Sequence, residues 1–131
     1  ENFEISELID NCLAKNKNKI INILSENNYS TEDCMIILRT FLSKTKRILK
    51  LAIELEKNKD INKTINSAKP PIFWKDKEIV KVQLNKWKTE KIKELIKNIN
   101  NVELEIKKNY NNSILIVTNF ILEKSRSEIN N

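Results

Sequence analysis

Two cysteines, and four of the fourteen glutamates, are the side chains in this sequence that we consider as candidates for a metal site. Cys12 and Cys34 are 22 residues apart, and the chain contains no histidine. This spacing fits no zinc motif, because a zinc site needs further thiolate or imidazole ligands. Without histidine, the chain also lacks the usual general base and the triads built around it. The sequence therefore predicts no catalytic residue.

The glutamates could form a carboxylate metal site only if their helices faced inward together. They are Glu90, Glu94, Glu103 and Glu105. Ferritin-like sites combine such glutamates with histidines, so ion pairs such as Glu90 with Lys93, or Glu94 with Lys97, account for them better. The absence of glycine also excludes the loops that cradle phosphates in Walker and Rossmann motifs. We therefore expect no metal and no cofactor.

Lysines are dense between residues 72 and 108, where ten lysines face six acidic residues. The whole chain has 24 basic and 18 acidic residues, a net charge of +6 and a pI near 9.3. Such a stripe could hold phosphates through counterion release, and Lys75, Lys81 and Lys88 are the candidate nucleic-acid contacts. Alternatively, these lysines form the solvated faces of helices, and A/T-rich codons shared by Lys, Ile and Asn set the charge.

The segment from Pro70 to Trp87 is the most distinctive part of the sequence. Phe73 and Trp74 directly follow a diproline, and Trp87 lies on the apolar side of the next predicted helix. These aromatics either fill a corner of the core or anchor a contact with another subunit. Phe73, Trp74 and Trp87 are therefore the candidate interface residues.

Apolar residues recur at three- and four-residue spacing along most of the chain, which predicts amphipathic helices. Ser30 and Asp33 are placed as a capping box, and Asn16 and Thr89 as N-caps. The expected helices cover residues 5–13, 20–24, 31–57, 61–65, 79–87, 92–110 and 114–122. The predicted fold is all-α, a single bundle of about six or seven amphipathic helices over residues 1–131.

The chain is long enough to bury a core without disulfides. Free buried thiols, the absence of a 20-residue apolar run and an N-terminus unlike a signal peptide favour a cytoplasmic protein without a membrane partner. Because the first residue is Glu and not Met, we expect the chain to be the C-terminal part of a longer protein.

Several short motifs occur in an order typical of one family. They are Ile5-Ser6-Glu7-Leu8-Ile9-Asp10 with Leu13-Ala14, Ile37-Leu38-Arg39 with Phe41, Pro70-Pro71-Ile72-Phe73-Trp74-Lys75, Gln83-Leu84, Trp87, and Glu103 with Lys107. In this order the chain resembles the C-terminal collar domain of the delta subunit of bacterial DNA polymerase III, a component of the clamp loader. It departs from many relatives after Trp87, where they place a serine and this chain has Lys88 before Thr89.

The resemblance implies a non-catalytic oligomerisation domain. Such a collar would pack beside the equivalent domains of the other clamp loader subunits in a hetero-pentamer, within a DNA-directed DNA polymerase complex. It would meet the sliding clamp and primed DNA only through the whole complex. The alternative hypothesis is a stand-alone basic helical domain that binds nucleic acid through its lysine stripe.

Overall fold

The computed structural model describes residues 2–127, and all regular structure in that range is helical. The predicted all-α bundle of six or seven helices is confirmed. Residue 1 and residues 128–131 of the predicted domain lie outside the described part. The elements are α1 (Phe3–Leu13), α2 (Lys17–Glu26), α3 (Thr31–Asn58), α4 (Ile61–Asn66), the 3-10 helix η1 (Trp74–Asp76), α5 (Lys77–Lys86), α6 (Thr89–Lys108), the 3-10 helix η2 (Tyr110–Asn112) and α7 (Ser113–Lys124).

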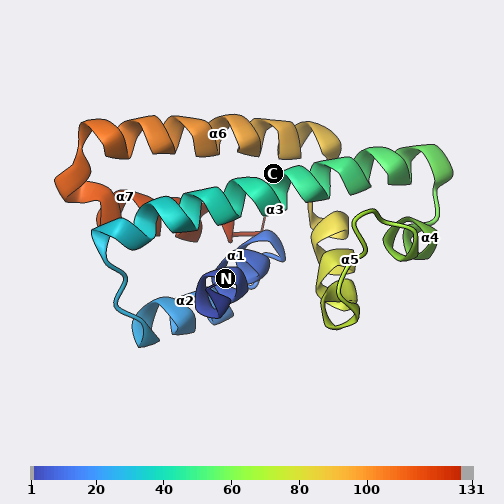
Figure 1. The fold of residues 1–131 in the computed structure, drawn as a ribbon, viewed down its shortest axis with the longest axis horizontal. Helices are drawn as coiled ribbons and strands as arrows, with labels where there is room; N and C mark the ends of the chain where they lie inside the picture. The colour runs from blue at the N-terminus through green and yellow to red at the C-terminus, as the bar shows by residue number, and fades with distance from the viewer. Residues whose placement is uncertain (1, 128–131) are drawn as a thin grey trace.

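Helix α3 is the axis around which the others are arranged. It runs beside α6 over most of its length, and it also contacts α1, α4, α5 and α7. In Figure 1, α1 and α2 lie below one half of α3, whereas α4 and α5 lie below the other half. The segment that joins α4 to α5 carries the diproline, and it lies on the same side of α3 as α1.

The long helix begins where the sequence predicts. The Ser30 hydroxyl accepts a hydrogen bond from the Asp33 amide at 3.1 Å, and the Asp33 carboxylate accepts one from the Ser30 amide at 2.8 Å. This reciprocal box satisfies two amides that have no partner within the helix. The helix ends at Asn58, one residue beyond the predicted end, and Lys59 follows in the left-handed conformation with φ 58°.

Two predicted caps are wrong. Asn16 occupies the N-cap position of α2, but its side-chain amide donates to the Asn11 side chain of α1 at 2.9 Å. Thr89 is already the first residue of α6, with Lys88 before it, and its hydroxyl donates to the Glu56 carboxylate of α3. In both places the side chain forms a hydrogen bond with a residue of another helix and not with a backbone amide of the helix it was expected to cap.

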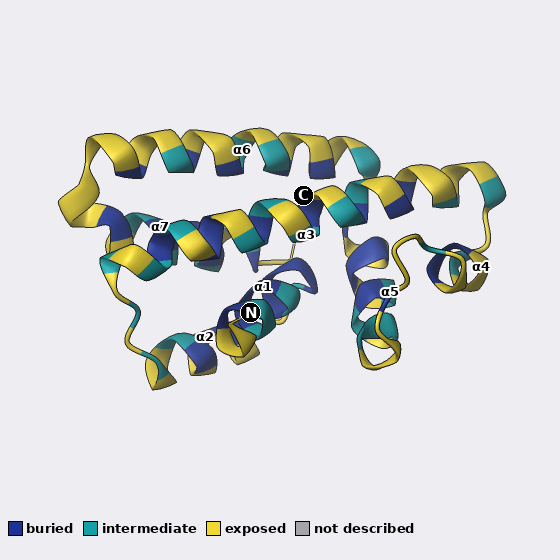
Figure 2. Cartoon of the chain, in the orientation of Figure 1, coloured by how far each residue is buried: buried dark blue, intermediate teal, exposed yellow. Residues whose placement is uncertain are grey.

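The core lies between α3 and the helices on either side of it, as the buried faces in Figure 2 show. The Phe41 ring of α3 packs against the Phe120 ring of α7, with centroids 5.7 Å apart. Cys12 and Cys34 are buried free thiols. Burial raises the pKa of Cys12 to about 12. Within residues 2–127, no helix has both the length and the apolar character that crossing a bilayer requires.

Candidate functional site

Trp87 lies in the core, directly after the last residue of α5. Only 8% of its surface is exposed, and its indole Nε1 donates to the Leu13 carbonyl at 2.8 Å. The Lys15 ammonium lies 3.9 Å from the centre of the ring. The prediction of Trp87 as an interface anchor is therefore wrong, because the ring and its N–H group are both engaged within the chain.

Phe73 and Trp74 occupy the opposite environment. Their exposed fractions are 57% and 70%, and their ring centroids are 6.0 Å apart. The Lys75 ammonium lies 5.4 Å from the centre of the Trp74 ring. The alternative in which these two aromatics fill the core is wrong. Both rings are free to meet a partner on the surface of the described chain.

The corner that presents these aromatics, residues 69–74, is held to its neighbours on both sides. Just before the diproline, the Lys69 carbonyl accepts a hydrogen bond from Lys50 of α3 at 3.0 Å. Just after the corner, the Lys77 ammonium donates to the Asn66 side chain of α4 at 3.0 Å. Ile72 is buried between the exposed prolines and the exposed aromatics. The buried Ile72 anchors the corner in the core, and the two hydrogen bonds, both at exposed positions, connect it to α3 and α4.

Gln83, another residue of the same motif, joins α5 to α1. It is fully buried, and its side-chain amide donates to the Asp10 carbonyl at 2.9 Å. The Asp10 carboxylate in turn pairs with Lys44 of α3 at 3.0 Å. This chain of contacts connects three helices next to the diproline corner, so Gln83 has a structural role.

The three lysines predicted as nucleic-acid contacts lie on separate elements. Lys75 is in η1 beside Trp74, Lys81 is in α5 and pairs with Glu78 at 3.3 Å, and exposed Lys88 precedes α6. The structure therefore places part of this stripe next to acidic side chains.

The glutamates of α6 are mostly neutralised by lysines of the same helix. The pair of Glu90 with Lys93 is confirmed at 3.4 Å, whereas Glu94 lies 4.0 Å from Lys91 in place of the predicted Lys97. Glu103 pairs with Lys107 at 3.1 Å. No cluster of three or more potential metal ligands occurs in residues 2–127.

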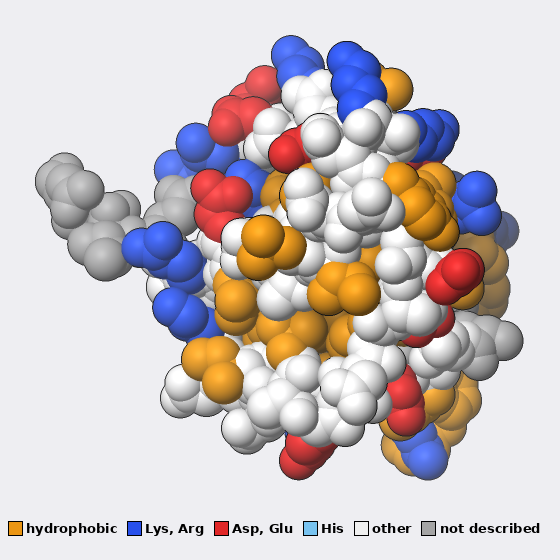
Figure 3. All heavy atoms as spheres, turned by 90° about the vertical axis from the view of Figure 1, so that its left-hand side faces the viewer, with side chains coloured by type: hydrophobic (Ala, Val, Ile, Leu, Met, Phe, Trp, Pro, Cys, Tyr) orange, Lys and Arg blue, Asp and Glu red, His pale blue; other side chains and the backbone are white. Residues whose placement is uncertain are grey.

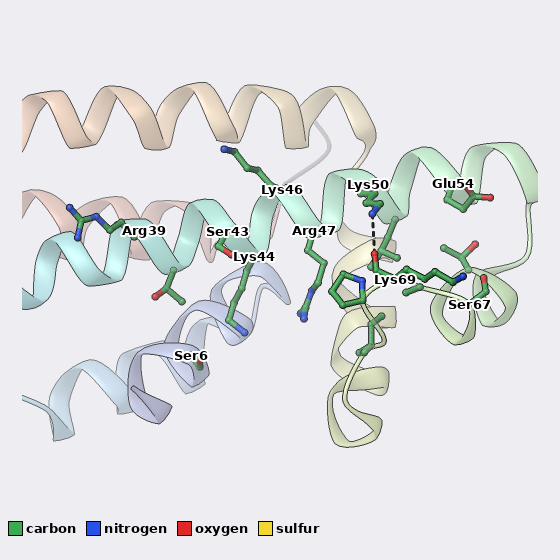
Figure 4. Close-up of a pocket in the computed structure, with 16 residues that line it drawn as sticks. Ser6, Arg39, Ser43, Lys44, Lys46, Arg47, Lys50, Glu54, Ser67 and Lys69 are labelled. Atoms are coloured by element: carbon green, nitrogen blue, oxygen red, sulfur yellow. Dashed lines mark hydrogen bonds between the residues drawn. The ribbon is translucent and has the colours of Figure 1, made fainter. Parts of the chain in front are cut away.

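A groove of about 1000 Å³ opens between α3, the start of α1 and residues 64–72. Figure 4 shows the residues that line this groove. We call it the basic groove, because one acidic residue, Glu54, lines it among six basic ones. The basic residues are Arg39, Lys44, Lys46, Arg47, Lys50 and Lys69.

Sequence reasoning missed the basic groove because it counted charges by segment. The four acidic residues near the ends of α3, among them Glu32, Asp33 and Glu56, offset most of its six basic residues in such a count. The signal was the spacing of the cations at positions 39, 46, 47 and 50, which places them along one side of a helix. Lys69 could not have been added to them, because it reaches the groove only through the tertiary fold.

A third surface feature, besides the aromatic corner and the basic groove, lies at the end of the molecule where α6, η2 and α7 meet. Tyr110, Ile114 and Leu115 are exposed there by 53%, 44% and 63%. Figure 3 shows apolar side chains in the middle of this end face, surrounded by uncharged polar groups and backbone. This end of the molecule differs in chemistry from the basic groove.

No protein-family model, curated protein sequence or solved structure matches the chain. The function of these surfaces is therefore inferred from their own chemistry.

Proposed function

We propose that this chain is the collar domain of a bacterial clamp loader delta subunit, a non-catalytic module that assembles with the other loader subunits in a hetero-pentamer. The observation that carries the proposal is the exposure of Phe73 and Trp74 at a corner that the rest of the fold holds in place. On this proposal the protein acts in the cytoplasm, in DNA replication, and reaches the sliding clamp and primed DNA through the whole complex.

Two adjacent aromatic rings in water are suited to an interface. Aromatic side chains, tryptophan above all, carry a large share of the binding energy between proteins, and a Phe or Trp ring buries 150–250 Å² when it is covered, on general scales. The same chain buries Trp87 almost completely. The fold thus has room for a large ring in its core and nevertheless leaves Phe73 and Trp74 outside.

The corner is also prepared for binding before a partner arrives. Hydrogen bonds from Lys50 and Lys77 hold the chain before and after the diproline. A surface that is already ordered loses less conformational entropy on association. The motif residues Gln83 and Trp87, which accompany the corner in the resembling family, bind α1 here and so support its position.

Association with partner domains tests this proposal. The isolated chain is mixed with the C-terminal domains of the other clamp loader subunits of its own organism, and complex formation is followed by sedimentation velocity. We expect a complex with at least one of these domains, and we expect Phe73→Ala and Trp74→Ala each to weaken it by about tenfold or more.

Leu104→Ala is the matched control, since Leu104 is exposed by the same 57% as Phe73 but lies on α6. It should leave the association unchanged. A well-folded chain that binds none of these domains at high micromolar concentration would contradict the proposal, and so would equal losses for Leu104→Ala and Trp74→Ala.

A further inference from the structure

The basic groove gathers cations that have few acidic partners. Lys44 pairs with Asp10, and Lys50 donates to the Lys69 carbonyl. Within residues 2–127, Arg39, Lys46 and Arg47 form no ion pair with an acidic side chain. A group of neighbouring positive charges without acidic partners produces a positive potential that attracts a negatively charged ligand.

Arg47 is the centre of this group. Its side chain is half-buried, and its Nε is shielded from water with no hydrogen-bond partner among the described residues. In Figure 4 its guanidinium points away from α3 into the space between α1 and the segment that carries Lys69. A guanidinium offers several donors in a planar fork that suits a phosphate or carboxylate.

The groove is long as well as basic. Arg39 and Lys50 are eleven residues apart on one helix, so their Cα atoms are separated by about 16 Å along the helix axis. A single small anion meets only two or three side chains. A row of this length, with Lys69 facing it from the other wall, suits a polymer with a charge at every unit.

We propose that the basic groove binds the phosphate backbone of a nucleic acid. Its lining includes six Arg and Lys side chains, one acidic side chain, Glu54, and the hydroxyls of Thr40 and Ser43. The basic and hydroxyl side chains are the residue types that contact phosphates and fix the position of a protein on DNA. The proposal is independent of the aromatic corner, and it assigns nucleic-acid binding to residues other than the predicted Lys75, Lys81 and Lys88.

The lining favours a nucleic acid over an acidic peptide. Peptide grooves supply deep apolar pockets for anchoring side chains. The two large aliphatic residues of this groove, Leu51 and Ile72, are each only 5% exposed, and the more accessible apolar residues that line it are Pro70 and Ala68. The groove is lined by no aromatic ring of the described chain. Single-stranded bases therefore have no ring in it on which to stack. The contact is therefore sequence-independent, and a duplex binds at least as well as a single strand.

Fluorescence anisotropy with a labelled duplex of about 20 base pairs and mixed sequence, in about 50 mM salt, tests this assignment. Arg39→Glu/Lys46→Glu should weaken binding about tenfold or more. Both side chains are exposed and form no ion pair in the described chain, so this variant keeps the fold. The matched control is Lys19→Glu/Lys108→Glu, which changes the net charge equally on exposed positions of α2 and α6, and it should weaken binding by no more than about threefold.

Arg47→Gln provides a second measurement that does not depend on charge reversal. The slope of log K against log salt should become shallower by about 0.9 if the guanidinium neutralises one phosphate. Circular dichroism on the same samples confirms that each variant is folded.

Three results would overturn the assignment. Equal weakening by the groove and control variants would mean diffuse attraction by net charge. An absence of duplex binding at low salt would exclude the site. Binding of a polyglutamate peptide that the groove variant abolishes, without binding of the duplex, would identify an acidic protein segment as the ligand.

Discussion

Trp74 and Trp87 stand at the two ends of one sequence motif and have opposite environments. Trp74 is 70% exposed, whereas Trp87 is 8% exposed and donates its N–H to the Leu13 carbonyl. The difference shows that the two halves of one sequence motif can have different structural roles. Its second half holds α5 to α1, and this attachment positions the first half at the surface.

The two rings differ in exposure because they have different interaction partners. A buried tryptophan needs an acceptor for its N–H, because leaving that group unpaired in the core is costly. The end of α1 supplies such an acceptor next to Trp87. The Trp74 ring instead lies beside Phe73 and Lys75, both close neighbours in sequence, and it remains in water.

The largest expected effect that separates the two ends is the loss of Trp87. Trp87→Ala should leave a cavity at the junction of α5 and α1 and lower the free energy of unfolding by about 3–5 kcal/mol. Urea denaturation followed by circular dichroism measures it. A loss below about 1 kcal/mol would contradict a core role for this ring.

Trp87→Phe sharpens the comparison by keeping a ring and removing the N–H group. The Leu13 carbonyl then loses its 2.8 Å donor within the protein. We expect the free energy of unfolding to fall by about 1–3 kcal/mol, which is the usual cost of a buried acceptor left without a partner. A variant as stable as the parent chain would show that the hydrogen bond adds nothing to the fit of the ring.

The titration of Cys12, the residue before Leu13, reports how well this end of the core excludes water. Burial raises its pKa from 9.0 to about 12. Above about pH 9 the unfolded chain therefore loses the thiol proton while the folded chain keeps it, so stability falls as the pH rises from about 9 toward 12. Between about pH 8 and pH 10 this single group should lower the free energy of unfolding by about 1 kcal/mol.

Urea midpoints at these two pH values, for the parent chain and for Cys12→Ala, isolate this contribution. The variant removes the thiol, so its stability should depend less steeply on pH. An identical dependence in both proteins would mean that other groups, such as lysines or tyrosines, account for the whole change.

The smallest effect on stability is expected at the exposed end. Trp74→Ala removes a ring that is mostly in water, so the free energy of unfolding should change by no more than about 0.5 kcal/mol. Thermal denaturation measures it beside Trp87→Ala. A loss comparable with that of Trp87→Ala would remove the distinction between the two tryptophans and place Trp74 in the core.

The sequence by itself determined the helices, because the forces that specify them act over a few residues. The three- and four-residue apolar spacing predicted α3 to within one residue of its end, and Ser30 with Asp33 predicted its start. The helical spacing of Arg39, Lys46 and Lys50 was also present in the sequence, although a count of charges by segment concealed it.

Only the tertiary structure decided which side chains meet across the bundle. Asn16 and Thr89 were expected as caps, but their side chains form hydrogen bonds with residues of α1 and α3. Trp87 became a core residue through a carbonyl 74 positions earlier in the chain, and Lys69 joined the basic groove through a contact with α3. Such pairings depend on how whole helices pack. They join segments that are far apart in the sequence, and the local spacing of residues carries no information about them.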